Sequence, residues 1–251
     1  MSYLNKKDKM LRRRAIGHAF AVICLLGLAA LTGCGNAGEG DQMEEGTGAG
    51  GAWEKHITEE TVRLKGIEGE YTLLFLTDTH AIVQSQGASE QEEANEEARY
   101  PTFFNEEGVP SAEQFPEWVR YANENGVDAV LLGGDIIDTP SEANLRWLEE
   151  QLGQLDMPYL YVNGNHDWTY PWEYMTEAGK EAYLRGIYPN EGSERFVSLT
   201  TAADSPVELV LAGHVHFYDR DVIEGERQVL QLVGGAGSQG NAILVHITGG
   251  E

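Results

Sequence analysis

Short runs of apolar, β-branched and aromatic residues recur along this chain, each bounded by glycine, proline or a cluster of polar residues. Four of these runs have the composition of buried strands, and they cover residues 71–77, 128–132, 158–162 and 207–212. Further strand-like segments cover residues 61–64, 195–200, 228–233 and 242–248. The pattern therefore predicts a protein built on β-sheet.

Two segments between these strands carry apolar residues at helical spacing. In the first, Ser111 and Gln114 fit a capping box, and the apolar positions that follow are Phe115, Trp118, Val119 and Ala122. In the second, which begins after Pro140 and Ser141, the apolar positions are Leu145, Leu148, Leu152 and Leu155. A third and less regular helix is expected over residues 173–184.

The order of these elements predicts how the strands pair. Strand and helix alternate between residues 71 and 162, which favours parallel strands joined by right-handed crossovers. The strands after residue 207 follow one another closely, so we expect antiparallel pairing among them. The fold class predicted from the sequence is therefore α/β, with a mixed sheet arrangement.

An acidic segment, residues 86–107, separates the first of the four buried strands from the first helix. It carries seven glutamates and one arginine. Such a run is most often a solvated surface loop. The alternative is a mobile lid beside a functional site, which would dock through Tyr100, Phe103 and Phe104. The sequence alone leaves both interpretations open.

A short segment with polar residues follows each of the four predicted strands. The segments are Asp78-Thr79-His80, Gly133-Gly134-Asp135, Gly164-Asn165-His166-Asp167 and Gly213-His214-Val215-His216. In an open α/β sheet, ligands bind outside the carboxyl ends of the strands. Oxygen and imidazole donors without any thiolate suit a hard or borderline divalent metal. The sequence therefore predicts a metal site at one edge of the sheet.

These four segments, in this order, resemble the pattern of the calcineurin-like metallophosphoesterases: D-x-H, G-D, G-N-H-[D/E], a lone histidine, and G-H-x-H. The resemblance covers residues 61–248, within a domain expected over residues 57–251. It implies a two-sheet mixed β-sandwich flanked by helices. It also implies a hydrolase of phosphate mono- or diesters, whose substrate is a small phosphate ester or a phosphorylated molecule.

The resemblance also implies a role for each site residue. Two metal ions (Mn, Fe or Zn) are expected, bridged by Asp135. One would be held by the matches Asp78, His80 and His216, and the other by Asn165, His214 and the lone histidine. His166 would give a proton to the leaving oxygen or stabilise it. Asp167 is expected to orient His166 or to cap the following segment, and Asp138 to lie in the turn or behind a ligand.

The lone histidine of the family pattern is missing from this chain. The seven histidines are His18, His56, His80, His166, His214, His216 and His246, so none lies between the third and the last motif. The short joint at residues 201–206 therefore reads as an internal deletion, and the second metal site is expected to be weaker. The alternative function is a metal-binding remnant of the family with impaired catalysis.

The N-terminal segment has the pattern of an export signal. Six basic residues precede an apolar stretch over residues 15–31, which ends at Leu31-Thr32-Gly33-Cys34. This sequence resembles a bacterial lipobox, which implies a signal peptide over residues 1–33, lipid on Cys34 and anchoring to the membrane. An uncleaved membrane helix is the alternative. Residues 34–56, rich in glycine and acidic residues, are expected to be a flexible tether.

Charge excludes one class of partner. Residues 1–33 carry six basic residues and one acidic residue, so the remainder has 11 Lys and Arg against 40 Asp and Glu, a formal charge of −29. Nucleic-acid binding depends on neutralising phosphates with basic groups. We therefore do not expect a nucleic acid to be the partner. With Cys24 in the leader and Cys34 lipidated, no disulfide is expected in the domain.

Overall fold

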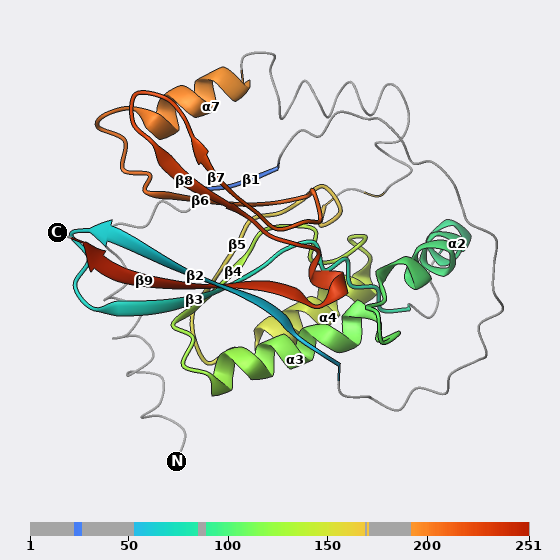
Figure 1. The fold of residues 1–251 in the computed structure, drawn as a ribbon. Coiled ribbons are helices and arrows are strands. Elements are labelled where there is room, and N and C mark those ends of the chain that lie inside the picture. Colours follow the sequence, from blue (N-terminus) through green and yellow to red (C-terminus); the bar gives the residue numbers. More distant parts are fainter. Residues whose placement is uncertain (1–22, 27–52, 85–88, 169, 171–191, 251) are drawn as a thin grey trace, which may run out of the picture.

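The computed structural model describes residues 23–26, 53–84, 89–168, 170 and 192–250, and it consists of two stacked sheets with helices on their outer faces (Figure 1). In spatial order, the five-stranded sheet contains β2 (His56–Lys65), β9 (Asn241–Gly250), β3 (Glu70–Leu76), β4 (Ala129–Leu132) and β5 (Tyr159–Tyr161). The four-stranded sheet contains β1 (Ile23–Leu26), β6 (Leu209–Gly213), β8 (Val229–Val233) and β7 (Asp219–Ile223). This is the mixed α/β arrangement that the sequence predicts.

The strand directions follow the chain order. β3, β4 and β5 pair in parallel, as the alternation of strand and helix predicts. β9 lies between β2 and β3. It pairs in parallel with β2 and antiparallel with β3. In the other sheet β7 and β8 pair antiparallel, but β6 and β8 are parallel, so the expectation of antiparallel pairing after residue 207 holds only in part.

Apolar side chains from both sheets fill the space between them. Phe75, Leu131, Leu211, Leu232 and Val245 are buried there and belong to one cluster. Burial of a side chain of this size contributes about 1.5–3 kcal/mol to stability. The sandwich interior therefore supports the strands whose ends carry the polar motifs.

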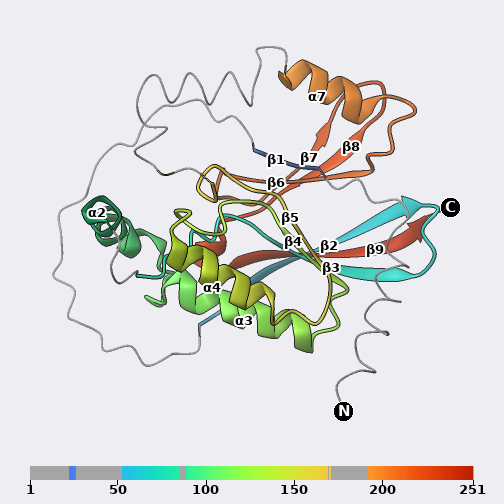
Figure 2. The ribbon, with the colours of Figure 1, turned by 180° about the vertical axis from the view of Figure 1, so that it is seen from behind.

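Helices α3 (Ser111–Glu124) and α4 (Glu142–Leu152) cover the outer face of the five-stranded sheet (Figures 1 and 2). Both lie where helical spacing predicts a helix. Phe115 and Trp118 of α3 and Leu148 of α4 pack in one buried cluster with Val130 and Leu132 of β4. This packing holds in place the two helices that connect β3 to β4 and β4 to β5.

Residues 195–200, read as a strand from composition, lie instead in helix α7 (Gly192–Thr201), so that prediction is wrong. Phe196 packs against Val207, Val210 and Val229 on the outer side of the four-stranded sheet. The Thr201 hydroxyl donates to the carbonyl of Val197, one helical turn back, at 2.7 Å. Tertiary packing outweighs the strand propensity of these residues.

The acidic segment contains a second unexpected helix, α2 (Glu90–Arg99), followed by the 3₁₀-helix η1 (Tyr100–Phe103). Its capping box is Ser89 with Glu92. The capping box expected at Ser111 is absent, because Pro110 holds the N-cap position and makes no side-chain cap. The solvated loop, one of the two interpretations of residues 86–107, is therefore wrong for residues 90–103.

Strand β1 lies within the segment that the sequence assigns to the signal peptide, and it pairs in parallel with β6. The expected helix over residues 173–184 and most of the tether lie outside the described residues. Within the described part of the chain, no helix combines the length and apolar character needed to cross a bilayer.

Candidate metal centre

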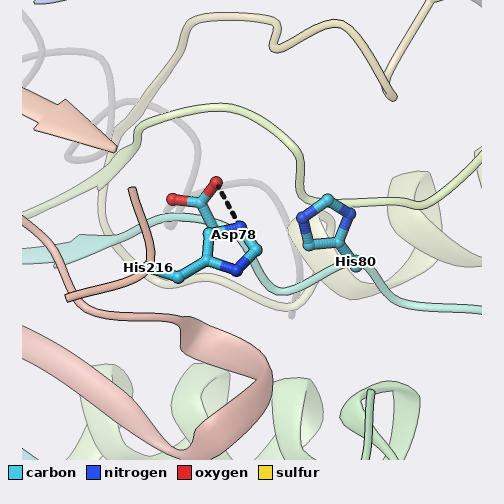
Figure 3. A group of neighbouring side chains, drawn as sticks. All are labelled: Asp78, His80 and His216. Atoms are coloured by element: carbon cyan, nitrogen blue, oxygen red, sulfur yellow. Dashed lines mark ion pairs between the residues drawn. The ribbon is translucent and has the colours of Figure 1, made fainter. Parts of the chain in front are cut away.

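The four polar motifs follow the carboxyl ends of β3, β4, β5 and β6 and bring side chains from both sheets together. Asp78, His80 and His216 form one group whose potential ligand atoms lie within 4.8 Å of one another. His80, Asp135 and His166 form a second group by the same measure. His80 belongs to both groups, and Figure 3 shows it beside the Asp78–His216 ion pair.

The backbone at these positions has an unusual conformation. Among the described residues, the non-glycine residues with positive φ are Asp78 (54°), His80 (45°), Asp135 (51°), His214 (77°) and His216 (61°). Each such residue costs of order 1–3 kcal/mol, and strain of this kind concentrates at functional sites. All five are metal ligands predicted from the sequence. The positions with unusual backbone conformation are therefore the same as the predicted ligand positions.

Glycines let the motif loops approach one another. A Cβ added to Gly213 would lie 2.0 Å from the Thr77 hydroxyl and 2.6 Å from a carboxylate oxygen of Asp78. A Cβ on Gly164 would lie 2.1 Å from a carboxylate oxygen of Asp135. These glycines begin the last and third motifs, at positions where a side chain would displace the carboxylates.

Substituting Gly213 by alanine is therefore expected to destabilise the protein by about 1–3 kcal/mol, the usual cost of overpacking a buried position. Thr77 and Asp78 are both buried and have little room to move. Urea denaturation measures the change. The matched control is Gly153→Ala, whose nearest contact would be a carbonyl at 3.2 Å. Equal free-energy changes in the two variants would contradict the assigned cause.

Asp78 is buried where the two sheets meet, and both of its carboxylate oxygens contact other residues. One carboxylate oxygen accepts hydrogen bonds from the Thr77 hydroxyl and from the backbone N–H of His214, both at 2.8 Å. The other lies 3.4 Å from Nε2 of His216. Burial raises the pKa of Asp78, but the bonds from His216 and His214 outweigh it, so the pKa is lowered. The Asp78 carboxylate in turn raises the pKa of His216.

His80 is the residue most in need of a further partner. Its side chain is 3% exposed, and neither ring nitrogen has a hydrogen bond of acceptable geometry. Nδ1 lies 3.3 Å from Oδ1 of Asp138, and Nε2 lies 4.0 Å from Oδ2 of Asp135. Buried polar atoms left unpaired are costly. A cation bound between Nε2 and the nearby carboxylates would remove that cost, so the donor set fits a divalent metal.

His166 lies at the rim of the second group and is held through Asp138. Its Nδ1 lies 2.9 Å from the backbone carbonyl oxygen of Asp138 and 3.3 Å from Oδ1 of the same residue. Its backbone N–H donates to Oδ1 of Asp135 at 2.9 Å. Burial lowers the pKa of His166, but the contacts with Asp138 and Asp135 outweigh it and raise the pKa above the usual value.

Asp167 does not orient His166, as the sequence suggested it could. Its carboxylate accepts four backbone N–H bonds, from Asp135 and Gly164 at 2.7 Å, Ile136 at 2.8 Å and Ile137 at 3.0 Å. These bonds tie the third motif loop to the second. The carboxylate that contacts the His166 ring is that of Asp138, which the sequence placed only in the turn or behind a ligand.

Of the two remaining predicted ligands, His214 stands apart from both groups. The side chain of His214 is exposed, and among the described residues it joins neither group. Asn165 is half-buried between Gly164 and His166. His214 is therefore less closely assembled with the other donors than the ligands expected for the first metal.

Two residues of the acidic segment lie behind the site, and sequence analysis missed the first of them, Arg99. Arg99 binds the carboxylate of Asp138, and the ring of Phe103 stacks on His80 with centroids 4.6 Å apart and planes 11° from parallel. The sequence named Phe103 only as part of a possible lid. A lone arginine within seven glutamates was the signal available for Arg99.

Comparison with protein families agrees with the motifs. The model of a family described as calcineurin-like phosphoesterase matches residues 71–214, more than half of the chain. A crystal structure of a dimetal phosphatase from Danio rerio is similar to this chain with 12% sequence identity and a TM-score of 0.39, covering 67% of this chain and 88% of that one. No curated protein matches the chain.

Proposed function

The chain belongs to the calcineurin-like phosphoesterases, and from this premise we propose that it hydrolyses phosphate mono- or diesters with two metal ions and a histidine that acts on the leaving oxygen. The observation that carries the proposal is the convergence of side chains from four strand ends around the buried His80. A packing role does not account for a buried imidazole without hydrogen bonds.

Asp78, His80, Asp135 and His216 would hold the first metal, and Asn165, His214 and Asp135 the second. Metal ions in such a site supply an activated water and neutralise the phosphoryl oxygens. Asp135 suits the shared position because a carboxylate has two oxygens to offer. Asn165 contributes a neutral carbonyl, which limits negative charge beside an anionic substrate.

His166 is proposed as the group that serves the leaving oxygen. Its Nδ1 faces Asp138, so we assign Nε2 as the nitrogen that donates a proton to the leaving oxygen. The contact with Asp138 fixes the ring orientation, and the raised pKa favours the protonated form near neutral pH. Protonation of the leaving oxygen is most needed where the alcohol leaves poorly.

Turnover of p-nitrophenyl phosphate and its bis ester tests this function directly. The purified protein is stripped of metal with a chelator and assayed with Mn²⁺, Zn²⁺, Fe²⁺ or Co²⁺ added back. We expect turnover that depends on added metal and is lost in Asp135→Asn. Turnover no higher than in that variant with any of the four metals would refute hydrolysis and favour the metal-binding remnant instead.

Unequal affinity of the two metal positions is a second expectation. Asp78, His80 and His216 form a compact group, whereas among the described residues His214 joins no such group, and the family's further histidine is missing from the sequence. In a Mn²⁺ titration, His216→Ala is expected to weaken the tighter equivalent by more than about 100-fold, since outer partners of metal ligands alone are worth about 10–100-fold. His214→Ala should leave that equivalent intact. The reverse result would overturn the assignment.

Export and lipid anchoring are proposed from the leader alone. Acylation of Cys34 would tether the domain outside the cytoplasm. Cleavage before Cys34 would also remove β1 and leave β6 as a sheet edge. Labelling cells with radioactive palmitate should mark the wild-type protein but not Cys34→Ala, and the label should follow the membrane fraction. A labelled Cys34→Ala protein would contradict this.

A further inference from the structure

The chain enters the five-stranded sheet beside the candidate metal centre. The backbone N–H of His56, the first residue of β2, donates to the carbonyl oxygen of Gly240 at 2.9 Å. Ser238 precedes Gly240 by two residues, and its backbone N–H donates to the carbonyl oxygen of Asp78 at 3.2 Å. β2 therefore begins at the end of the sheet where the first motif lies, and β9 ends at the opposite end (Figures 1 and 2).

The residues just before β2 are fixed to helix α3. The ring of Trp53 meets the ring of Trp118 edge-on, with centroids 5.6 Å apart. Nζ of Lys55 lies 4.3 Å from the centroid of the Trp53 ring and 3.7 Å from Oε2 of Glu117. Residues 53–56, which the sequence assigns to the tether, thus pack on the domain. The tether therefore joins the domain at Trp53, at the end that carries the metal centre.

The length of the tether determines which end of the domain a lipid anchor would hold near a membrane. Residues 35–52, a stretch of 18 residues, separate Cys34 from Trp53. A flexible glycine-rich chain of this length has an r.m.s. end-to-end distance of about 20–25 Å. A domain of about 200 residues is about 40 Å across. Lipid on Cys34 would therefore keep the metal-centre end nearer the bilayer than the opposite end.

Large apolar side chains are exposed beside the motifs at this same end. Trp168, directly after the third motif, is 50% exposed, and Phe217, directly after the last motif, is 59% exposed. Val162, which follows β5 and precedes the third motif, is 40% exposed. Tryptophan and phenylalanine on one side of a membrane-attached protein are typical of contact with the boundary between headgroups and acyl chains. Tether position and exposed aromatic rings thus indicate the same membrane-facing end.

Charge restricts the kind of membrane surface that fits. Helix α2 lies at the metal-centre end of the molecule (Figures 1 and 2), and its exposed side chains include Glu90, Glu93 and Glu97. The chain after residue 33 has a formal charge of −29. Anionic lipid headgroups attract basic segments and repel acidic ones. A zwitterionic surface contacted through apolar side chains therefore fits this end better than an anionic one.

We propose that the metal-centre end docks on a zwitterionic bilayer surface through Trp168 and Phe217, and that the substrate is a phosphate ester in the headgroup of a membrane lipid. The docking part rests on lipid at Cys34, and the substrate part rests on the proposed function. An enzyme tethered with its site toward the bilayer meets lipid headgroups at high effective concentration. A soluble ester gains nothing from this orientation, so the two kinds of substrate are distinguishable.

The first test needs no activity. After lipidation of Cys34 and removal of Cys24 with the leader, a single introduced cysteine can be labelled selectively. Phe217→Cys is labelled with an environment-sensitive fluorophore, and the processed protein is reconstituted into phosphatidylcholine vesicles. The matched control is Leu199→Cys on α7, at an apolar position 62% exposed. If Phe217→Cys does not fold by circular dichroism, Trp168→Cys takes its place.

At position 217 we expect a blue shift of the emission and quenching by nitroxide-labelled lipid, and at position 199 neither. Replacing half of the phosphatidylcholine by phosphatidylglycerol should weaken the quenching, because the surface then repels α2. No response at position 217, or an equal response at both positions, would overturn the docking. Stronger quenching on the anionic vesicles would overturn the preference for a zwitterionic surface.

The second test compares esters that carry the same phosphate with and without acyl chains. The pairs are phosphatidic acid with glycerol 3-phosphate, and phosphatidylcholine with glycerophosphocholine. For the reconstituted protein we expect kcat/KM to be at least about 10-fold higher for the lipid in one of these pairs. Trp168→Ser with Phe217→Ser should reduce that ratio by about 10-fold or more. The matched control, Leu199→Ser, should leave the ratio unchanged.

The outcomes separate the inference from the proposed function. If the protein hydrolyses none of these esters and no p-nitrophenyl phosphate, the function fails together with the lipid substrate, and the fluorescent labels still decide the docking. If p-nitrophenyl phosphate is hydrolysed but neither lipid is preferred, the function stands and the lipid substrate is overturned. Equal losses on both members of a pair in the serine variants would overturn the docking role. Label on the wild-type chain would show an unprocessed leader and would overturn the docking.

Discussion

Replacing Asp135 by asparagine is expected to lower kcat for p-nitrophenyl phosphate by about 1,000-fold or more, since metal-assisted charge stabilisation is worth several kcal/mol. Asp135 is buried, and its Oδ2 lies 4.0 Å from Nε2 of His80. Its Oδ1 also accepts the backbone N–H of His166. Asparagine keeps the shape but removes the negative charge and one of two acceptor oxygens. The variant therefore removes the proposed shared ligand while it keeps the shape of the side chain.

Steady-state kinetics and elemental analysis together measure this effect. Bound metal should fall by at least one equivalent in Asp135→Asn. The matched control is Asp128→Asn at the other end of β4, where the carboxylate accepts the backbone N–H of Thr72 at an exposed site. That variant should retain wild-type turnover and metal content. If Asp135→Asn kept both metals and more than about a tenth of the activity, the bridging role would be refuted.

Much of the fold was predictable because its strands carry local signals. The apolar runs before the four motifs are short and bounded by glycine or proline, and all four contain strands. The expectation that all four are buried is wrong for β5, which lies at the end of its sheet and is largely exposed. Helices α3 and α4 show apolar residues at the spacing that packing against a sheet requires. Where local pattern and tertiary burial agree, sequence reasoning succeeds.

The elements that sequence reasoning missed lack such agreement. The helical state of residues 192–201 depends on Phe196 packing against strands that come later in the chain. The acidic helix α2 has almost no apolar face, so periodicity could not reveal it. Its Ser89–Glu92 capping box was a readable signal, but the same pattern at Ser111 was misleading.

The site shows the same division between local and long-range information. The motif positions were readable from the strand ends, and the structure brings Asp78, His80, Asp135, His166 and His216 into two groups. The partner of the His166 ring was not readable. Asp167 is adjacent to His166 in the sequence, yet its carboxylate accepts hydrogen bonds from the backbone N–H groups of residues 135–137 and 164 instead. Asp138, 28 residues away, takes that position because the loops after β4 and β5 meet.

Replacing His166 by glutamine is expected to produce a loss that depends on the leaving group. General acid catalysis contributes about 100–10,000-fold, so kcat for phenyl phosphate should fall by about 100-fold or more. With p-nitrophenyl phosphate the loss should stay below about 10-fold, because p-nitrophenolate departs without a proton. Metal content should remain that of wild type, since His166 is not expected to be a ligand.

The control for this prediction is His246→Gln on β9, where Nδ1 lies 3.3 Å from the Thr72 hydroxyl, within the five-stranded sheet. It should leave both rates unchanged. If His166→Gln instead lost metal and turned over both esters equally slowly, His166 would be acting as a ligand within the His80–Asp135–His166 group. That result would also reassign the Asp138 contact, since it would then orient a metal ligand rather than a proton donor. The leaving-group dependence thus decides which chemistry the His166 imidazole performs.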